Sequence, residues 1–388
     1  MQTEASLNGS DTTIKTTSSV HDITAEKPPF GSRFLTDEAE VWTRNAWDHV
    51  PPPTDQDEII AASLLKQRSA PVPDEEKRKY NEKPARNWDN FYRTNSSNFF
   101  RDRRWLHNEF PELVNAAKPE AGPMTIVEVG CGAGNAVFPL LAANLNPNLT
   151  LRAYDYSHHA VKLVENNPLY TSPPIGSIHA AVWDLTSDSL PEGVEPGTVD
   201  IISMVFVFSA LHPDEWVKAV TNVHKMLKPG GLVMFRDYGR YDMAQLRFKG
   251  GRLLDDNFYA RGDKTRVYFF ELDELALLFT GVRARSAQPP NVVTEVVEDD
   301  SEDGPLASTS RPLSPDPASG EMWSSSVTAN PEPAHIHPSL LSSPPKSLFT
   351  AEQLGIDRRL LVNRKRQVKM YRVWMQGKFR KLVDSNTS

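Results

Sequence analysis

The stretch that decides the fold is residues 125–135, TIVEVGCGAGN, in which a short apolar run breaks into glycines. Ile126, Val127 and Val129 predict a buried β-strand, and the glycine turn after them, residues 130–134, predicts the start of a helix. Glycine lets a ligand approach the backbone closely because no Cβ stands in the way. A strand, a glycine turn and a helix in this order predict the edge of a cofactor site.

The spacing of these glycines argues against a dinucleotide, whose fingerprint is G-x-G-x-x-G. Counting from Gly130 puts Asn135 at the last glycine position, and counting from Gly132 puts Val137 there. The pattern that is present, E-x-G-x-G-x-G from Glu128, resembles the first motif of class I methyltransferases that use S-adenosylmethionine. A glycine run is also compatible with a simple tight turn, so the acidic residues that follow decide between the two.

Length and composition indicate one catalytic domain with tails. The chain has 388 residues, but its two ends and one inner stretch have little to bury. The net charge of −7 alone would argue against a nucleic-acid partner, yet acidic and basic residues are segregated along the chain, so the total is misleading. Cys131 is the single cysteine, which excludes an internal disulfide framework and a thiolate zinc cluster.

Targeting and membrane patterns are not recognised in the sequence. The first residues, MQTEASLNGSDTTIK, carry neither the apolar core of a signal peptide nor the arginines of a transit peptide. No apolar run approaches the length of a membrane helix. We therefore expect a cytoplasmic protein with no membrane partner, and no pattern indicates a metal site.

The N-terminal third divides into a tail and a cap. Residues 1–29 are rich in Ser, Thr and acids and are expected to be disordered. Residues 30–118 form the predicted cap and linker. Within it, the aromatic residues of 30–50 supply apolar surface for docking, 58–67 predicts a helix, and the Pro-bounded segment 71–84 predicts a charged linker.

Residues 87–113 interleave aromatic and arginine side chains. The aromatic members are Trp88, Phe91, Tyr92, Phe99, Phe100 and Trp105, and the arginines are Arg93, Arg101, Arg103 and Arg104. Aromatic rings beside arginines suit stacking on unpaired bases and binding of phosphates. The alternative is an amphipathic helical cap with its aromatics inward and its arginines solvated. For the cluster as a whole we favour RNA binding.

The region 119–294 shows regular strand–helix alternation. Strands are predicted at 149–154, 178–183, 199–207 and 232–235. The first two of these end in Asp155 and Asp184. Asp155 lies 25 residues after Gly130, where a doubly wound sheet offers a carboxylate to a ribose diol, although either acid alone is more often a helix cap or turn residue. The fold class is therefore α/β, a doubly wound parallel sheet with helices on both faces and ligands at the carboxyl edge.

Two later segments depart from this alternation. Residues 237–264 make a long connection that contains Arg247 and Arg261, as expected of a functional insertion beside the site. Residues 295–350 are acidic and rich in Pro and Ser, and are expected to be disordered. Class I methyltransferases end in an antiparallel hairpin, and the resemblance implies that this acidic insertion is the hairpin's loop.

Residues 351–388 return to the fold as a basic segment and the last strand, 369–375. The basic side chains are Arg358, Arg359, Arg364, Lys365 and Arg366. A basic run is usually a solvated face. One that joins a sheet edge beside the site also predicts phosphate contacts.

Several motifs together resemble the eukaryotic tRNA 3-methylcytidine methyltransferases: WDNFY, NFFRDRRWL, EVGCGAGN, AYDYS, WDLT, FVFSALHPD, FRDYGRYDMAQLRFK and DRRLLVNRKRQVKMYRVWMQGKF. The opening FGSRF and the later DRRLLVNR are most similar to the threonine-tRNA branch. The resemblance spans most of 30–290 and 350–381. It implies a seven-stranded sheet, methylation of an anticodon-loop cytidine, tRNA as partner, and an aminoacyl-tRNA synthetase or other accessory protein as a candidate further partner. The acidic insertion is not part of the family pattern.

The resemblance also implies S-adenosylmethionine as cofactor, bound by Trp88, Tyr92, Gly130, Gly132, Gly134, Asp155, Asp184, Leu185 and Val205. In this set the glycines pass the methionine moiety and Asp155 binds the ribose hydroxyls. Asp184 accepts from the adenine amine, and Leu185 offers its backbone N–H to the ring. Val205 lines the pocket, and the two aromatic residues close it from the cap.

The chemistry of the target narrows the mechanism. Methylating carbon 5 of cytosine requires a cysteine nucleophile, and the single thiol lies in the glycine turn, so covalent catalysis is not expected. The ring nitrogen N3 has its own lone pair and needs mainly positioning of a base turned out of its stack. Candidates for this role are Phe206 and Phe208 for stacking, with Asp237 facing the exocyclic amine. Equally, both phenylalanines are candidates for the core, and Asp237 for a salt bridge with a neighbouring arginine.

Two other functions fit part of this pattern. A small-molecule methyltransferase would keep the glycine turn but would not need the arginine-rich cap and tail. A non-catalytic RNA-binding module would keep the basic surface, but it would not need Asp155 and Asp184.

Overall fold

The computed structural model describes residues 33–97, 99–284, 335–342 and 345–383. The tail 1–29 and most of the acidic stretch 295–350, up to residue 334, lie outside the described residues, and so do the predictions of disorder made for them. Among the described helices none is long and apolar enough to cross a bilayer.

An eight-stranded sheet with the order β1-β10-β11-β6-β5-β2-β3-β4 forms the centre of the molecule. Its strands are β1 (Ala46–Asp48), β2 (Met124–Val129), β3 (Leu149–Asp155), β4 (Ser177–Val182), β5 (Val199–Val205), β6 (Leu227–Tyr238), β10 (Phe349–Asn363) and β11 (Val368–Lys381). Strands β2 to β6 pair in parallel, and β11 joins β6 antiparallel. The α/β doubly wound class is thereby confirmed, with β1 as an eighth strand beyond the seven expected.

Alternate residues of the parallel strands supply two separate cores, as expected of a sheet buried on both faces. Helices α9 (Trp216–Met226) and α11 (Leu272–Thr280) cover one face, where Trp216 and Phe235 are fully buried. Four helices cover the other: α4 (Leu106–Glu109), α5 (Pro111–Ala116), α6 (Val137–Ala142) and α7 (His158–Glu165). The carboxyl ends of β2, β3 and β5 remain available for a site between these layers.

The N-terminal cap is more regular than its composition predicts. It contains η1 (Glu38–Thr43), α1 (Gln56–Arg68), α2 (Asp74–Asn81) and α3 (Pro84–Asn95). Helix α1 confirms the helix expected at 58–67. Helix α2 occupies the segment 71–84, so the prediction of a linker there is wrong for most of its length.

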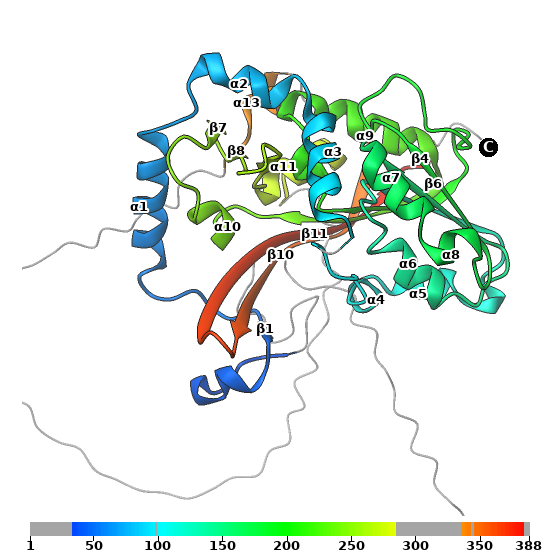
Figure 1. Cartoon of the computed structure of the whole chain (residues 1–388), viewed down its shortest axis with the longest axis horizontal. Helices are drawn as coiled ribbons and strands as arrows, with labels where there is room; N and C mark the ends of the chain where they lie inside the picture. Colours follow the sequence, from blue (N-terminus) through cyan, green and yellow to red (C-terminus); the bar gives the residue numbers. More distant parts are fainter. Residues whose placement is uncertain (1–32, 98, 285–334, 343–344, 384–388) are drawn as a thin grey trace, which may run out of the picture.

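The aromatic residues of the opening segment dock as expected, but at an unexpected place. Strand β1 pairs antiparallel with β10, and Trp47 lies opposite Leu360. Val41 and Trp47 are buried with Leu360 and Val362 in a small cluster of their own. Figure 1 shows η1 and β1 at the far end of the long, curved β10–β11 hairpin.

The hairpin itself overturns one prediction. Asn363 pairs with Val368, so the turn between β10 and β11 consists of residues 364–367. The acidic insertion is therefore not the hairpin's loop, because it precedes both strands and lies between α11 and β10. A short helix, α13 (Pro338–Ser342), lies within the stretch 295–350, and its Leu340 is fully buried, so the prediction of disorder is wrong for this last part of the stretch.

The connection predicted as a functional insertion folds as a small antiparallel sheet. Its strands are β7 (Leu253–Asp255), β8 (Phe258–Ala260) and β9 (Arg266–Tyr268), preceded by α10 (Met243–Leu246). The remaining elements are η2 (Pro119–Ala121), α8 (Pro168–Thr171), η3 (Phe208–Ala210) and η4 (Pro213–Glu215).

Candidate active site

The glycine turn has the backbone geometry that its sequence predicts. Gly130 and Gly132 have φ values of 67° and 55°, in the left-handed region that favours glycine. A Cβ at Gly130 would collide with the side chain of Val207, and one at Gly132 with the hydroxyl of Tyr92. Both positions therefore require glycine, and the second brings the cap helix α3 directly onto the turn.

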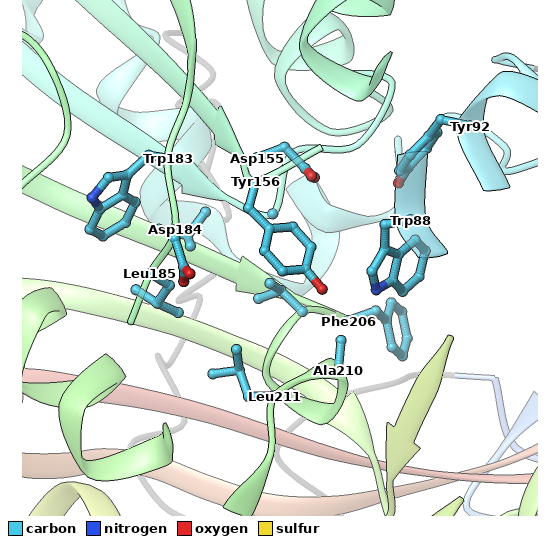
Figure 2. Close-up of a pocket in the computed structure, with 13 residues that line it drawn as sticks. Trp88, Tyr92, Asp155, Tyr156, Trp183, Asp184, Leu185, Phe206, Ala210 and Leu211 are labelled. Carbon is cyan, nitrogen blue, oxygen red and sulfur yellow. The ribbon is translucent and has the colours of Figure 1, made fainter. Parts of the chain in front are cut away.

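A cavity opens at the carboxyl ends of β2, β3 and β5 (Figure 2). Among the predicted cofactor residues, it is lined by Trp88, Tyr92, Gly130, Asp155, Asp184 and Leu185. Six further residues that were not predicted as site residues are Val129, Tyr156, Trp183, Val207, Ala210 and Leu211. Tyr156 and Trp183 immediately precede or follow a predicted acid, so adjacency to these acids was the available signal.

Asp155 is placed to bind a diol. Its Oδ2 accepts from the Gly132 N–H at 2.9 Å, and its Oδ1 accepts from the Ser157 N–H at 2.9 Å. Burial raises the pKa of this carboxyl to about 6, while the two backbone donors act in the opposite direction. A carboxylate has about four lone-pair sites, so two backbone bonds leave capacity for ribose hydroxyls.

The opposite wall is formed by the turn after β4. Asp184 Oδ1 accepts from the backbone N–H of Thr186 at 2.8 Å and from its hydroxyl at 2.7 Å. Figure 2 shows the Tyr156 ring between this turn and Trp88. Aromatic and apolar surfaces that face one another, with an acid at the edge, suit a flat adenine ring with an exocyclic amine.

Two predicted cofactor residues, Gly134 and Val205, line neither this cavity nor the adjoining one, which Gly132 lines. The space at Gly134 is closed by the Phe138 ring of α6, so this glycine serves helix packing. Val205 has its side chain buried in the core, while its carbonyl accepts from Arg103 Nη1 at 3.1 Å. The next residue, Phe206, has a φ of 57° and lines the cavity instead.

A second cavity adjoins the first and shares Trp88, Tyr92, Gly130 and Phe206 with it. Its other walls carry Phe99, Phe100, Arg101, Arg103, Trp105, Tyr238, Arg261, Arg372 and Trp374. The Phe206 ring lies 5.0 Å from that of Tyr238 and 6.4 Å from that of Trp374. Phe206, Tyr238 and Trp374 therefore form an aromatic chamber beside the cofactor cavity.

Three of these arginines lie over its rings. Arg103 lies 5.6 Å from the centroid of Phe206. Arg261 is 5.5 Å from the Tyr238 ring, and Arg372 is 5.0 Å from that of Trp374. Alternating guanidinium and aromatic groups suit a nucleotide, whose base stacks and whose phosphate is anionic.

The structure corrects two of the three predicted catalytic residues. Phe208 is fully buried and stacks with Trp216 and Phe270 in the core. Asp237 is also fully buried; it accepts from the N–H groups of Ser209 and Tyr238, and burial raises its pKa to about 6. Neither residue lines either of the two cavities described above, whereas Phe206 lines both.

The reason for the error at Asp237 is side-chain direction, whereas Phe208 lies in η3 and packs into the core. Successive side chains of a strand point to opposite faces. On β6 this puts Asp237 in the core and Tyr238 beside Phe206. The available signal in the sequence was that an aromatic residue, Tyr238, directly follows Asp237.

The predicted RNA-binding arginines separate into groups. Arg101, Arg103 and Arg261 line the second cavity. The exposed members are Arg93, Arg104, Arg247, Arg364, Lys365 and Arg366. Arg358 is half-buried, and burial lowers its pKa.

Arg359 is committed to the fold and is thereby corrected as a phosphate contact. It forms ion pairs with Asp48 at 3.2 Å, with Asp357 at 2.9 Å and with Glu109. These three acids raise the pKa of its guanidinium further. The positive charge of Arg359 is thus already paired with carboxylates of the protein itself.

The residues present fit S-adenosylmethionine. The glycine turn leaves room for the methionine end, Asp155 suits the ribose diol, and Asp184 with Leu185 borders an aromatic slot for adenine. Among the residues that the structure describes, no group of three His, Cys, Asp or Glu side chains could hold a metal ion. Fold and site together define a class I methyltransferase that uses S-adenosylmethionine.

Comparisons with known proteins refine this class. Residues 127–233 match the family model described as "Methyltransferase domain". A Saccharomyces cerevisiae protein named tRNA(Thr) (cytosine(32)-N(3))-methyltransferase is 43% identical over 90% of this chain, which spans 45% of that protein's length. Schizosaccharomyces pombe tRNA N(3)-methylcytidine methyltransferase trm140 is 38% identical, with 95% of this chain and 97% of the relative covered. Danio rerio tRNA N(3)-cytidine methyltransferase METTL2 is 35% identical, with 92% and 90% covered. The chain belongs to the tRNA N3-methylcytidine methyltransferase family.

Proposed function

We propose that this protein transfers a methyl group from S-adenosylmethionine to N3 of a cytidine in the anticodon loop of tRNA, and that threonine tRNAs are its substrates. The observation that carries the proposal is the aromatic chamber of Phe206, Tyr238 and Trp374, which adjoins the cofactor cavity. The name of the Saccharomyces cerevisiae relative, which specifies tRNA(Thr) and a cytosine, supports the choice of substrate.

The chamber suits a base that has been turned out of its stack. S-adenosylmethionine supplies a methyl group bonded to a positively charged sulfur. The protein's own residues then need to hold the base flat, exclude water and direct N3 toward the cofactor cavity. Methylation at N3 leaves the base cationic, and the faces of aromatic rings attract cations. Phe206 serves both needs because its ring borders the two cavities.

Covalent catalysis is not part of the proposal. Cys131 is buried, and burial holds the pKa of its thiol well above the ordinary range. A neutral, buried thiol is a poor nucleophile. Transfer to a ring nitrogen with its own lone pair does not require one.

We assign the contacts with the rest of the tRNA to exposed basic side chains. Arg101 lies at the wall of the second cavity, and Arg364, Lys365 and Arg366 form the turn of the β10–β11 hairpin. An aminoacyl-tRNA synthetase or other accessory protein is proposed as a second partner and the cytoplasm as the location; affinity purification of the tagged chain and fluorescence imaging test these two points.

The proposal is tested with purified protein, S-adenosylmethionine and an unmodified threonine tRNA transcript. Nucleoside mass spectrometry should detect 3-methylcytidine, and a transcript with uridine at the target cytidine should give none. A product from the uridine transcript, or no product from either, would contradict the proposed substrate. Binding of tRNA weaker than about millimolar at low salt, where phosphate contacts are strongest, would favour a small-molecule methyltransferase.

Tyr238→Ala provides a matched test within the protein. Tyr238 lines the second cavity and not the first, so its loss should affect the base and spare the cofactor. Stacking of a base is worth about 1–3 kcal/mol, and we expect kcat/KM for tRNA to fall by about 10- to 100-fold. Affinity for S-adenosylhomocysteine, measured by calorimetry, should stay within about twofold of wild type, a difference of less than about 0.5 kcal/mol.

A further inference from the structure

Arg103 reaches from the N-terminal cap to the glycine turn. Its backbone N–H donates to the carbonyl of Asn135 at 2.8 Å. Asn135 Nδ2 in turn donates to the carbonyl of Phe100 at 3.4 Å. Two hydrogen bonds therefore join the C-terminal end of the motif to residues 100–103, and Arg103 has a defined position beside the residues that the cofactor must pass.

The guanidinium of Arg103 points into the site. Its Nη1 donates to the Val205 carbonyl at 3.1 Å and lies 3.6 Å from Glu128 Oε1. The side chain is 14% exposed and lines the second cavity next to Gly130 and Gly132. A guanidinium carries five N–H donors in a rigid fork, so the bond to Val205 leaves donors for a planar anion.

Two buried acids beside the glycine turn, Glu128 and Asp155, favour a cation such as Arg103 there. Glu128 is 2% exposed, its Oε2 accepts from the Val137 N–H at 3.1 Å, and no hydrogen-bond donor reaches its Oε1 in the described part of the chain. Burial raises the pKa of Glu128 to about 7, and the charge of Arg103 acts against that rise. With Asp155 on the neighbouring strand, a ligand carboxylate that enters here meets two acids.

The other arginines of this cavity are placed differently. Like Arg103, Arg261 and Arg372 lie over aromatic rings, those of Tyr238 and Trp374, but their side chains donate to the Arg266 carbonyl and to Asp242. Arg101 is exposed. Arg103 is thus the lining arginine that the structure ties to both Glu128 and the end of the glycine motif.

We propose that Arg103 binds the carboxylate of the cofactor's methionine moiety, and that it is a cofactor contact rather than a phosphate contact of the RNA. An arginine–carboxylate pair is a strong, planar, charge-assisted contact. It would also keep the ligand's negative charge apart from Glu128 and Asp155. The proposal rests on the cofactor and not on the identity of the tRNA, so its first test needs no RNA.

Calorimetry on the full chain compares S-adenosylmethionine with decarboxylated S-adenosylmethionine, which keeps the ammonium and sulfonium groups but lacks the carboxylate. We expect wild type to prefer the carboxylate form by about 10- to 100-fold, the range of a hydrogen bond to a charged group. Arg103→Gln should lose most of this preference and retain its affinity for the decarboxylated compound. Arg101→Gln, two positions earlier in the same cavity wall, should keep the wild-type preference.

Two results would overturn the proposal. Equal weakening of both compounds by Arg103→Gln would show that Arg103 only supports the fold, and an unchanged preference would remove it from the cofactor. If the glutamine variant does not fold, Arg103→Lys decides: it keeps the charge but loses the fork, so the preference should fall, and an unaltered preference again overturns the proposal.

Binding of tRNA supplies an independent readout. The slope of log affinity against log salt should be the same for wild type and Arg103→Gln. A fall of about 0.7–0.9 would mean that Arg103 neutralises a phosphate, and would return this side chain to the RNA. Failure of the chain to methylate threonine tRNA would not affect either measurement.

Discussion

Asp155 is the residue whose ionisation should set the pH range of cofactor binding. Its pKa, raised to about 6 by burial, leaves it ionised at about pH 7.5 and mainly protonated near pH 5. A protonated carboxyl has fewer acceptor sites for ribose hydroxyls. We expect the affinity for S-adenosylhomocysteine, measured by calorimetry, to fall as the pH is lowered through 6. Asp155→Asn should weaken binding at neutral pH by about 1.5–3 kcal/mol and remove this pH dependence.

The same raised pKa of Asp155 also affects the stability of the protein without ligand. Because the folded-state pKa of Asp155 exceeds the ordinary value of 3.8, the folded protein holds this proton more tightly than the unfolded chain does. Its contribution to the free energy of unfolding is therefore present below about pH 4 and is lost as the pH rises through 6. A pH dependence of cofactor affinity that survives in Asp155→Asn would assign it to another group.

Site residues that lie in or beside a sequence motif were predictable, whereas those whose place in the site depends on the direction of a strand's side chains were not. Gly130 follows directly from the glycine motif, and Asp155 and Asp184 from their places at the ends of predicted strands. Asp237 was predicted in place of Tyr238 because composition does not reveal the register of the strand, and therefore does not reveal which side chains point toward the site. Trp374 approaches Phe206 only through the pairing of β11 with β6, which no local pattern specifies.

At the scale of the element, helix α3 is held over the cofactor cavity by Asp89. Its Oδ1 accepts from the Ser157 hydroxyl at 2.7 Å and from the His159 N–H at 3.1 Å, at the start of α7. Trp88 and Tyr92, on the same helix, line the cavity. Asp89→Ala should cost about 0.5–2 kcal/mol at this cap, and we expect it to speed cofactor release by several-fold.

Stopped-flow fluorescence of Trp88 on displacement of S-adenosylhomocysteine measures that rate. Asp57→Ala, an acid in the first turn of α1, is the matched control and should leave release unchanged. Equal release rates in the two variants would show that α3 does not depend on Asp89 for its closed position.

The β10–β11 hairpin divides its basic residues between two tasks. Replacing Arg364, Lys365 and Arg366 with glutamine should reduce the salt slope of tRNA binding by about 0.7–0.9 for each phosphate that the turn no longer neutralises, with the melting temperature unchanged. Arg359→Gln should instead lower stability by about 1.5–3 kcal/mol, because it removes the ion pairs with Asp48, Glu109 and Asp357, the last of which keeps Arg236 as a partner.

Filter binding across a salt series and thermal unfolding distinguish these outcomes. An unchanged slope in the triple variant would make the turn a solvated surface. Sequence alone grouped these residues as one basic run. The separation depends on Glu109, 250 positions away along the chain from Arg359, and such long-range partners cannot be read from local composition.

At the scale of the whole molecule, the last part of the stretch 295–350, which was expected to be disordered, belongs to the fold. Ile336 and Leu340 are buried, and the His337 N–H donates to Glu274 Oε1 at 2.9 Å. Replacing residues 298–334 with a short Gly/Ser linker should leave the melting temperature within a few degrees and methyl transfer near wild type, because loop-closure entropy changes slowly with length.

A longer deletion, residues 298–347, is the matched comparison. It removes Ile336 and Leu340 as well, and we expect a loss of about 2–5 kcal/mol for each large apolar side chain taken from the core. Thermal unfolding measures both variants. Equal melting temperatures would mean that α13 contributes nothing to stability, and loss of methyl transfer in the shorter deletion would give the acidic stretch a role in the reaction.

The pairing of β1 with β10 brings together two segments that lie far apart in the sequence, with Ala46 opposite Leu361. As the chain leaves the ribosome, residues 124–238 are able to form their parallel strands early, because each partner follows soon after the last. The segment that carries Trp47 has no strand to join until β10, which lies far along the chain, has been synthesised. During that interval its apolar side chains are exposed, and their protection falls to the nascent chain's surroundings rather than to its own fold.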